Sequence, residues 1–425
     1  MLLGKSSACQ QLLATDKFQA RLVFAALYLL LLLPLAMIYS RVAADIIGVG
    51  LGVLLLVWSF RARNWSWLRE PPVVIALILW AYSVLVVSPF ALDPGVSFAR
   101  AGWIRFILLF AAIAYWLSSY HEELRKIAAV MLGILLLAGA DALYQYCTGF
   151  SLAGVPYEQD RLTGPFKKVV IGIYLAKLAM PVFGILLYSA WKAHQKKRLA
   201  FLALALVYCF GVVLLSNERT ATFTLALGIV LVGGGVAFSF RQARLAFTLS
   251  LVAFAALIAV SYQSLPSVQK RVQETEFVLQ EFSQSDYGQL WKASFLLWQE
   301  HPIIGVGMMN FRLACPTLLD EGRVIFCSTH SHNIYLEMLS EYGGIGLLLM
   351  LLLVTSLVMA VVKSNMPPPR ERCILTFFAA AGLLINFFPL VPTQSFFSNW
   401  PALLAWQSIA WSIAITRAQK EVSHV

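Results

Sequence analysis

The sequence predicts an all-α polytopic membrane protein, because it is apolar, poor in charge and divided into long hydrophobic stretches. Hydrophobic residues make up 60% of the 425 residues and charged residues 12%, whereas soluble domains carry about 25% charged residues. The mean hydropathy is +0.76. This composition excludes a water-soluble enzyme, a disordered scaffold and a disulfide miniprotein.

Apolar stretches of about 20 residues can cross the ~30 Å hydrocarbon core of a bilayer, and about twelve of them occur along the chain. An even number of spans places both termini on the same side of the membrane. We expect the transmembrane helices at Leu22–Ser40, Val42–Phe60, Pro72–Phe90, Trp103–Ser119, Ile127–Cys147, Val169–Ala190, Leu199–Leu215, Ala221–Phe240, Leu245–Tyr262, Gly344–Val362, Cys373–Val391 and Pro401–Ile415.

One connection is much longer than the others, at 263–333 between the ninth and tenth spans. The chain therefore divides into 1–262, which holds the first nine transmembrane helices, the large loop 263–333, and 334–425, which holds the last three. No internal repeat supports a solenoid.

The distribution of Lys and Arg predicts the orientation. The chain has 32 Lys and Arg against 21 Asp and Glu, a net charge of +11, but in a membrane protein the position of the cations matters more than their sum, and no nucleic-acid partner is expected. Most cations flank one set of helix ends, which the positive-inside rule makes cytoplasmic together with both termini. They include Arg61, Arg63, Arg69, Arg125, Lys126, Lys192, Lys196, Lys197, Arg198, Arg241, Arg244 and Arg417. The large loop and its chemistry then face the periplasm.

Within the large loop, an amphipathic helix is expected to begin at Asp286, whose carboxylate can cap it, and to end at His301-Pro302. Trp291, Phe295 and Trp298 follow at i, i+4 and i+7 on one face. Such a helix lies on the bilayer surface or on the bundle. Stacking of Trp291 or Trp298 on a sugar is the alternative.

Two cysteines of the same loop, Cys315 and Cys327, enclose a short segment that contains a proline. Because a periplasmic loop is exposed to oxidising conditions, we predict a disulfide between them. Two free buried thiols are the alternative, and neither arrangement makes them catalytic.

Lys and Arg also occur in the loops predicted to be periplasmic, where the positive-inside rule disfavours them. Arg161, Lys167 and Lys168 lie in the loop after the fifth span, and Arg219 lies in a tight hairpin between two spans. Guanidinium groups bind phosphate in a bidentate manner. These cations would suit a membrane-held phosphate or diphosphate, although Arg219 could instead pair with Glu218 or Asp141, and the two lysines could contact lipid headgroups.

Arg105 and Lys177 fall within predicted spans, where a charge costs at least about 2.5 kcal/mol and usually faces a partner or a cavity. Ligand binding and simple ion pairing are both open for them. A transporter, with Arg105, Lys177 and Asp141 as an ion pathway, is the alternative from another class of protein. The long loop before the tenth span favours surface chemistry instead.

Two histidines, His330 and His332, stand where the large loop returns to the membrane. A His-x-His pair could begin a metal site, but its third ligand is not evident, and we expect neither a metal nor another cofactor. A neutral histidine can instead accept the proton of a sugar hydroxyl, which contributes about 10²–10⁴-fold to a rate. Glu337 and Glu341 follow on one face of the next helix and could orient a ring or pair with cations.

These motifs resemble those of O-antigen ligases, within the wider O-antigen ligase and polymerase superfamily. The resemblance rests on the order of several short motifs and on the predicted topology. The motifs are His332-Asn333-x9-Gly343, Pro302-x-x-Gly305-x-Gly307, the Arg219 hairpin, and Arg161-x-x-Gly164 after the fifth span.

The resemblance implies a C-type glycosyltransferase fold and a metal-independent, inverting transfer of O-antigen polysaccharide from undecaprenyl diphosphate to lipid A–core, at the periplasmic face of a Gram-negative inner membrane. It implies that His332 is the general base and that Arg161 and Arg219 hold the diphosphate. The remaining residues expected to bind substrate are Arg105, Lys167, Lys168, Lys177, His330, Asn333, Glu337, Trp291 and Trp298. Membrane lipids are the other expected partner.

Two related activities remain open alternatives. An O-antigen polymerase would use the same donor with a lipid-linked glycan as acceptor, and a protein O-oligosaccharyltransferase would use a protein. Both enzymes would also use Arg161 and Arg219 to bind the donor diphosphate. Only the identity of the acceptor therefore distinguishes the three activities.

Overall fold

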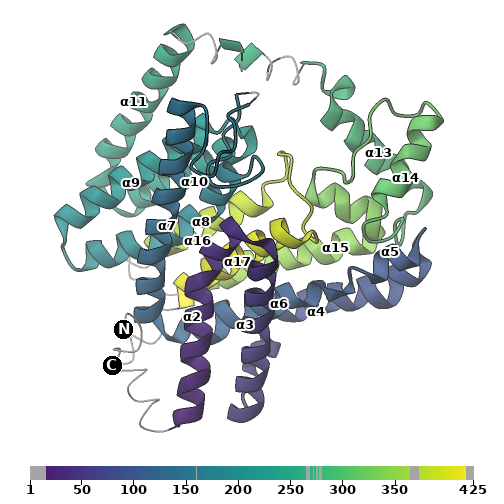
Figure 1. The fold of residues 1–425 in the computed structure, drawn as a ribbon, viewed down its shortest axis with the longest axis horizontal. Coiled ribbons are helices and arrows are strands. Elements are labelled where there is room, and N and C mark those ends of the chain that lie inside the picture. The colour runs from purple at the N-terminus through teal and green to yellow at the C-terminus, as the bar shows by residue number, and fades with distance from the viewer. Residues whose placement is uncertain are drawn as a thin grey trace.

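The computed structural model describes residues 16–158, 160–264, 269–270, 272–273, 276, 280–363 and 373–417. Within these ranges the protein is a helical bundle without strands beyond two isolated bridges, which confirms the all-α fold class. Figure 1 shows α17 in the middle of the bundle, α9 and α11 toward one edge, and α13 and α14 together near the opposite edge, close to the start of α15. Residues 1–15 and 418–425 lie outside the described residues, as do parts of the loop 263–333.

The helices follow the apolar stretches of the sequence, and short 3-10 and π turns extend several of them. The main helices are α2 (Lys17–Tyr39), α3 (Arg41–Ala62), α4 (Pro71–Tyr82), α5 (Pro94–Phe98), α6 (Ile104–Ala111), α7 (His121–Thr148), α8 (Ile171–Lys192), α9 (Lys196–Leu215), α10 (Arg219–Ser239), α11 (Ala243–Ser264), α13 (Asp286–Glu300), α14 (Phe311–Asp320), α15 (Ile334–Lys363), α16 (Cys373–Phe387) and α17 (Asn399–Arg417).

Nine helical stretches of the described chain are long and apolar enough to cross a membrane, as expected of a multi-pass membrane protein. Helices also occupy the other three predicted spans, as α11, α16 and α17. α16 is shorter than a usual span at 15 residues, and α17 is buried along almost its whole length because it lies inside the bundle. The total of twelve spans and the three-part division of the chain stay predictions.

The segment of the large loop from α13 to α14 has an apolar cluster of its own. Leu290 and Leu297 of α13 pack with Phe311 and Leu318 of α14 in this cluster, separate from the core of the bundle. The aromatic face predicted for α13 is not the face that packs: Phe295 is 44% exposed. α13 rests against α15, so it lies on the bundle.

The start of α13 differs from the prediction by one residue. Ser285 caps the helix, with its side chain accepting from the amide of Gly288, and Asp286 is the first helical residue, where its charge still favours the helix N-terminus. The predicted end at His301 is correct.

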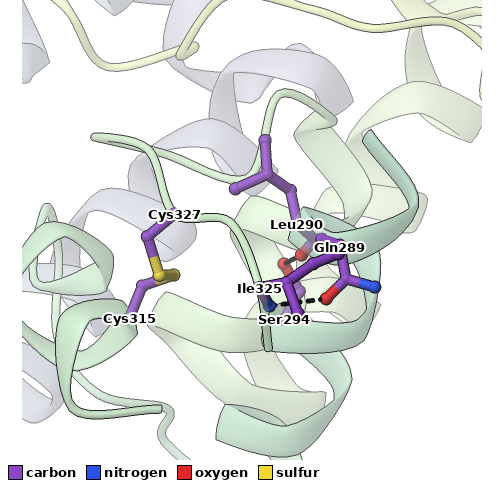
Figure 2. The surroundings of a disulfide bond; sticks show 6 residues. All are labelled: Gln289, Leu290, Ser294, Cys315, Ile325 and Cys327. Carbon is purple, nitrogen blue, oxygen red and sulfur yellow. Dashed lines mark hydrogen bonds between the residues drawn. A yellow bond between two sulfur atoms is a disulfide. The ribbon is translucent and has the colours of Figure 1, made fainter. Parts of the chain in front are cut away.

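A disulfide joins Cys315 of α14 to Cys327 of the following loop, and Figure 2 shows it beside α13. On that helix, the side-chain oxygen of Gln289 accepts from the amide of Ile325 at 2.9 Å. The loop that leads to the two histidines is therefore fixed to α14 by a covalent bond and to α13 by a hydrogen bond.

Replacing Cys315 and Cys327 by Ser should destabilise the loop by about 2–3 kcal/mol, because a closed loop of this kind restricts the unfolded chain. Limited proteolysis in detergent should cut the double variant between α13 and α15 faster than wild type. Cys147→Ser, at an exposed free cysteine, is the matched control. Equal cleavage of wild type with and without reductant would contradict the prediction.

Candidate active site

α15 is broken at Gly343, where the backbone leaves the helical conformation. Gly343 has φ 69° and ψ −170°, a region that only glycine adopts readily. A Cβ atom there would lie 2.2 Å from the carbonyl oxygen of Ile303. The glycine of the His-Asn-x9-Gly motif is therefore required both by its backbone conformation and by the close approach of the segment 302–307.

The break also frees carbonyl groups of α15 for that segment. The amide of Val306 donates to the carbonyl of Ser340 at 2.9 Å, and the amide of Gly307 donates to the carbonyl of Glu341 at 3.0 Å. Gly305, at φ 70°, has no room for a Cβ atom against the backbone of α15. The two motifs that are separate in the sequence thus form one packed unit.

Glu341 anchors the start of α14. Its carboxylate, fully buried, accepts from the amides of Met309 and Phe311 at 2.7 and 3.2 Å. These two amides flank the N-terminus of the helix, where a negative charge is favoured. Glu341 therefore fixes the 302–311 segment to α15.

Glu337 anchors the segment 388–398, between α16 and α17. Its buried carboxylate accepts from the hydroxyl of Ser395 and from the amide of Phe396, the latter at 3.2 Å. We expect Glu337 to bind substrate, and in the structure its carboxylate is engaged by this segment of the protein.

His330 and His332 lie with their ring centroids 3.9 Å apart. Nε2 of His332 is 3.3 Å from the hydroxyl of Ser328, and its ring lies edge-on to Tyr287 of α13, with centroids 6.1 Å apart. The amide of Thr393 donates to the backbone carbonyl of His332 at 2.7 Å. The half-buried ring is thus held by α13, its own loop and the 388–398 segment.

Asn333 caps the helix that follows the histidines. Its side-chain oxygen accepts from the amides of Tyr335 and Leu336 at 3.0 and 3.2 Å, as an N-cap residue does. Its side-chain nitrogen donates to the carbonyl of Pro389 at 2.7 Å. We expect Asn333 to bind substrate. In the structure, both its side-chain oxygen and its side-chain nitrogen form hydrogen bonds within the protein.

Both imidazoles are held in the neutral form. Burial, followed by the charges of His332 and Arg312, lowers the pKa of His330 to about 4, although the backbone of Thr393 opposes this. Burial also lowers the pKa of His332. At neutral pH His332 is therefore able to accept a proton.

These lowered pKa values predict a pH dependence of stability. The unfolded chain binds a proton at each histidine near pH 6.5, whereas His330 binds it only near pH 4 in the folded protein. The free energy of unfolding should therefore decrease as the pH falls through this window. Thermal unfolding in detergent measures this, and His330→Asn should flatten the curve. A melting temperature that is constant between pH 7 and pH 4.5 would contradict it.

Arg312 is a residue of this site that the sequence analysis missed. It lies in the first turn of α14, where its guanidinium is 3.9 Å from the sulfur of Met309, and its charge acts on His330, Glu337 and Glu341. Arg312 directly follows Phe311, five residues after the last glycine of the Pro-x-x-Gly-x-Gly motif. Nothing in the sequence connects it to the two histidines that come after the disulfide.

The arginine side of the site begins with the loop between α7 and α8, which carries Arg161. Gln145 of α7 fixes this loop: its side-chain oxygen accepts from the amides of Thr163 and Gly164, both at 2.9 Å. Asp141, one turn earlier, accepts from the amide of Leu152 at 2.6 Å. Arg161 is exposed at the surface of the loop that these two buried side chains hold.

Glu218 and Arg219 stand at the junction of α9 and α10, against the start of α8. The carboxylate of Glu218 accepts from the amides of Gly172 and Ile173 at 2.5 and 3.3 Å. Burial raises the pKa of Glu218 to about 7, although these two bonds and the charge of Arg161 lower it. Arg161 therefore lies near Glu218, and Arg219 is the next residue, the first of α10.

The 388–398 segment connects the arginine side to the histidine side. One helical turn after Arg219, the ring of Phe223 lies edge-on to Phe388, with centroids 5.5 Å apart. The next residue, Pro389, receives the hydrogen bond from Asn333. The two groups of candidate residues therefore lie at the same end of the bundle, linked by this segment.

Arg105 and Lys177 differ in their surroundings. The guanidinium of Arg105 pairs with Asp45 at 2.9 Å and donates to Asn399 at 2.9 Å, so ion pairing, left open by the sequence, is what the structure shows. Lys177 lies on α8, and its carbonyl accepts from Ser408 of α17 at 2.5 Å. No ion pair connects Arg105, Lys177 and Asp141 in the described part of the chain, as a shared ion pathway would require.

The other candidate residues lie at the surface or against the loop. Lys167 and Lys168 are exposed next to the start of α8. Trp291 packs edge-on against Phe282, with centroids 5.1 Å apart. The indole nitrogen of Trp298 donates to the carbonyl of Pro302 at 3.2 Å.

The described residues contain no group of three or more His, Cys, Asp and Glu side chains arranged to hold a metal ion. His330 and His332 are close together, and the side chains in hydrogen-bond or ring contact with them include Ser328, Thr329 and Tyr287. These are not the usual ligands of zinc.

Residues 204–351 match a family described as O-Antigen ligase. No curated protein matches the chain. A solved structure described as "Structural coordination of polymerization and crosslinking by a peptidoglycan synthase complex" is similar at 15% sequence identity and a TM-score of 0.46, over 82% of this chain and 98% of that chain. The family match includes Arg219, the large loop, His332 and Gly343, while the Arg161 loop lies outside it.

The apolar helices indicate a multi-pass membrane protein, and the family match implies a glycosyltransferase-like membrane enzyme of polysaccharide assembly that acts on lipid-linked glycans. The match is consistent with a member of the O-antigen ligase and polymerase superfamily and confirms the resemblance found in the sequence.

Proposed function

We propose that the protein is an O-antigen ligase, which transfers O-antigen polysaccharide from undecaprenyl diphosphate to lipid A–core in lipopolysaccharide biosynthesis. The observation that carries the proposal is the half-buried, neutral His332, fixed by three elements at the same end of the bundle as Arg161 and Arg219. Its spacing to Gly343 favours a ligase over a polymerase. The site faces the periplasm and both termini face the cytoplasm, as the distribution of cations predicts.

In the proposed reaction, Nε2 of His332 accepts the proton of an acceptor hydroxyl while its oxygen attacks the anomeric carbon of the donor. The bond between that carbon and the diphosphate oxygen breaks, with inversion of configuration. Arg161 and Arg219 bind the diphosphate, and their charges stabilise the negative charge that develops on the leaving group. The reaction needs no metal because the diphosphate is already a good leaving group.

An apolar groove of about 270 Å³ between α15 and α16 supports a lipid-linked donor. Val354, Leu384, Phe388 and Pro389 are among its lining residues, and the last two follow the C-terminal end of α16. That end is next to Phe223, one turn from Arg219. A polyprenyl chain in this groove would therefore place its diphosphate between the arginines and His332.

Product analysis with purified protein in liposomes tests the assignment. Given labelled undecaprenyl-diphosphate glycan and lipid A–core, a ligase moves the label to lipid A–core. Longer lipid-linked glycan from donor alone would identify a polymerase, the alternative that the family match also supports. Label on an added acceptor protein would identify a protein O-oligosaccharyltransferase.

Arg219→Lys should lower kcat about tenfold, because an ammonium group keeps the charge but lacks the planar fork that binds two phosphate oxygens. Steady-state transfer at saturating donor and acceptor measures this effect. Arg198→Lys, at a partly exposed arginine near the start of α9, is the matched control. Unchanged kcat and donor KM in Arg219→Lys would leave Arg219 with a structural role only.

A further inference from the structure

Three buried polar atoms without a hydrogen-bond partner gather beside His332. They are Nε of Arg312, Nε2 of His330 and Oγ1 of Thr393; the backbone of Thr393 lies near the ring of His330 but forms no hydrogen bond of normal geometry with it. Leaving a buried polar atom without a partner is unfavourable, so three such atoms at one place form a candidate binding site for a polar group.

Independent contacts bring the three residues together. The ring of His330 lies 3.9 Å from that of His332, whose carbonyl accepts from the amide of Thr393 at 2.7 Å. Two residues later, the hydroxyl of Ser395 lies 3.9 Å from the sulfur of Met309, and Arg312 lies 3.9 Å from the same sulfur.

The three atoms can all act as donors. The hydroxyl of Thr329 is 3.2 Å from Nδ1 of His330, and when it donates to that nitrogen the proton of the neutral ring is on Nε2. Nε of Arg312 always carries a proton, and a threonine hydroxyl can donate. A set of donors with one permanent positive charge favours an anionic oxygen over a neutral hydroxyl.

We propose that Arg312, His330 and Thr393 form a subsite for an anionic substituent, a carboxylate or phosphate, of the acceptor glycan. The inference rests on the proposed function, because it places the subsite next to His332, which accepts the proton of the attacking hydroxyl. The substituent would orient the acceptor so that this hydroxyl faces His332, and the site would select acidic acceptors. Arg161 and Arg219, on the other side of the 388–398 segment, bind the diphosphate of the donor.

The experiment compares two acceptors with the reconstituted protein: intact lipid A–core, and lipid A–core whose phosphates are removed and whose carboxylates are amidated. Wild type should show a KM about tenfold higher for the neutralised acceptor, with donor KM and kcat unchanged, since charge-assisted hydrogen bonds are lost. Inorganic phosphate should inhibit by competition with the acceptor.

Two variants should reproduce this loss on the intact acceptor only. Arg312→Lys keeps the charge that faces Glu337 and Glu341 but lacks the Nε donor, and Thr393→Val lacks the hydroxyl. Each should raise KM for intact lipid A–core about three- to tenfold and leave KM for the neutralised acceptor unchanged. Thr248→Val, at an exposed threonine of α11, is the matched control.

Other outcomes would overturn the inference. Equal KM for the two acceptors in wild type would show that no anionic group is recognised. Higher donor KM in the variants would reassign the atoms to the donor, and equal losses on both acceptors would show a purely structural role. Absence of any transfer by wild type would instead contradict the proposed function, so the two failures are distinguishable.

Discussion

His332→Ala should lower glycan transfer by about 10²–10⁴-fold, the usual contribution of a general base. The ring of His332 is half-buried and neutral, and only Nε2 faces a nearby hydroxyl, that of Ser328. Alanine removes the proton acceptor but leaves the backbone bond from Thr393 in place. Single-turnover transfer to lipid A–core, at saturating donor, measures the effect on the chemical step.

The matched control is His121→Ala, at the start of α7 and distant in sequence from the candidate site. Both variants should insert into the membrane and retain the Cys315–Cys327 disulfide with the melting temperature of wild type. A His332→Ala protein as active as wild type would remove the assignment of the general base. Lost activity with a lowered melting temperature would count as misfolding and not as support.

Gly343→Ala should inactivate the enzyme by displacing the unit on which His332 depends. The backbone conformation of Gly343 costs a non-glycine residue about 1–3 kcal/mol, and the added carbon would lie 2.2 Å from the carbonyl oxygen of Ile303. Because the Ile303 carbonyl belongs to packed backbone and cannot turn aside as a flexible side chain would, the 302–307 segment must move away from α15. Transfer activity should fall more than tenfold, and protease cleavage near α14 should become faster.

Gly133→Ala, in α7, is the control, because a Cβ atom there meets nothing within 4 Å. It should leave activity and stability close to those of wild type, since alanine is favoured over glycine within a helix. If Gly343→Ala were as active and as protease-resistant as wild type, the packing of the two motifs would not position His332.

The helices could be predicted from the sequence because an apolar stretch of span length has few other stable arrangements in a bilayer. Their details could not. The sequence predicts a helix that carries Glu337 and Glu341, but not its break at Gly343, because the close approach of Ile303 to that glycine is a tertiary contact. Similarly, the burial of α17 follows from its central place and not from its pattern.

For the candidate site, sequence order indicated the motifs but not their contacts. Arg161 and Glu218 are far apart in the chain, and it is Gln145, an ordinary residue of a predicted span, that fixes the Arg161 loop. The sequence could not show whether Arg105 binds a ligand or forms an ion pair, because its partner Asp45 lies on another helix. Polar residues inside a span are ambiguous until their partners are known.

The most direct test of the account is the stoichiometry of transfer by the reconstituted protein. With undecaprenyl-diphosphate O-antigen and lipid A–core, wild type should release one undecaprenyl diphosphate for each lipid A–core that gains a glycan, without added metal ion. His332→Ala should do neither. Release of undecaprenyl diphosphate without modified lipid A–core, or with growth of the lipid-linked glycan instead, would contradict the claim that this protein is an O-antigen ligase.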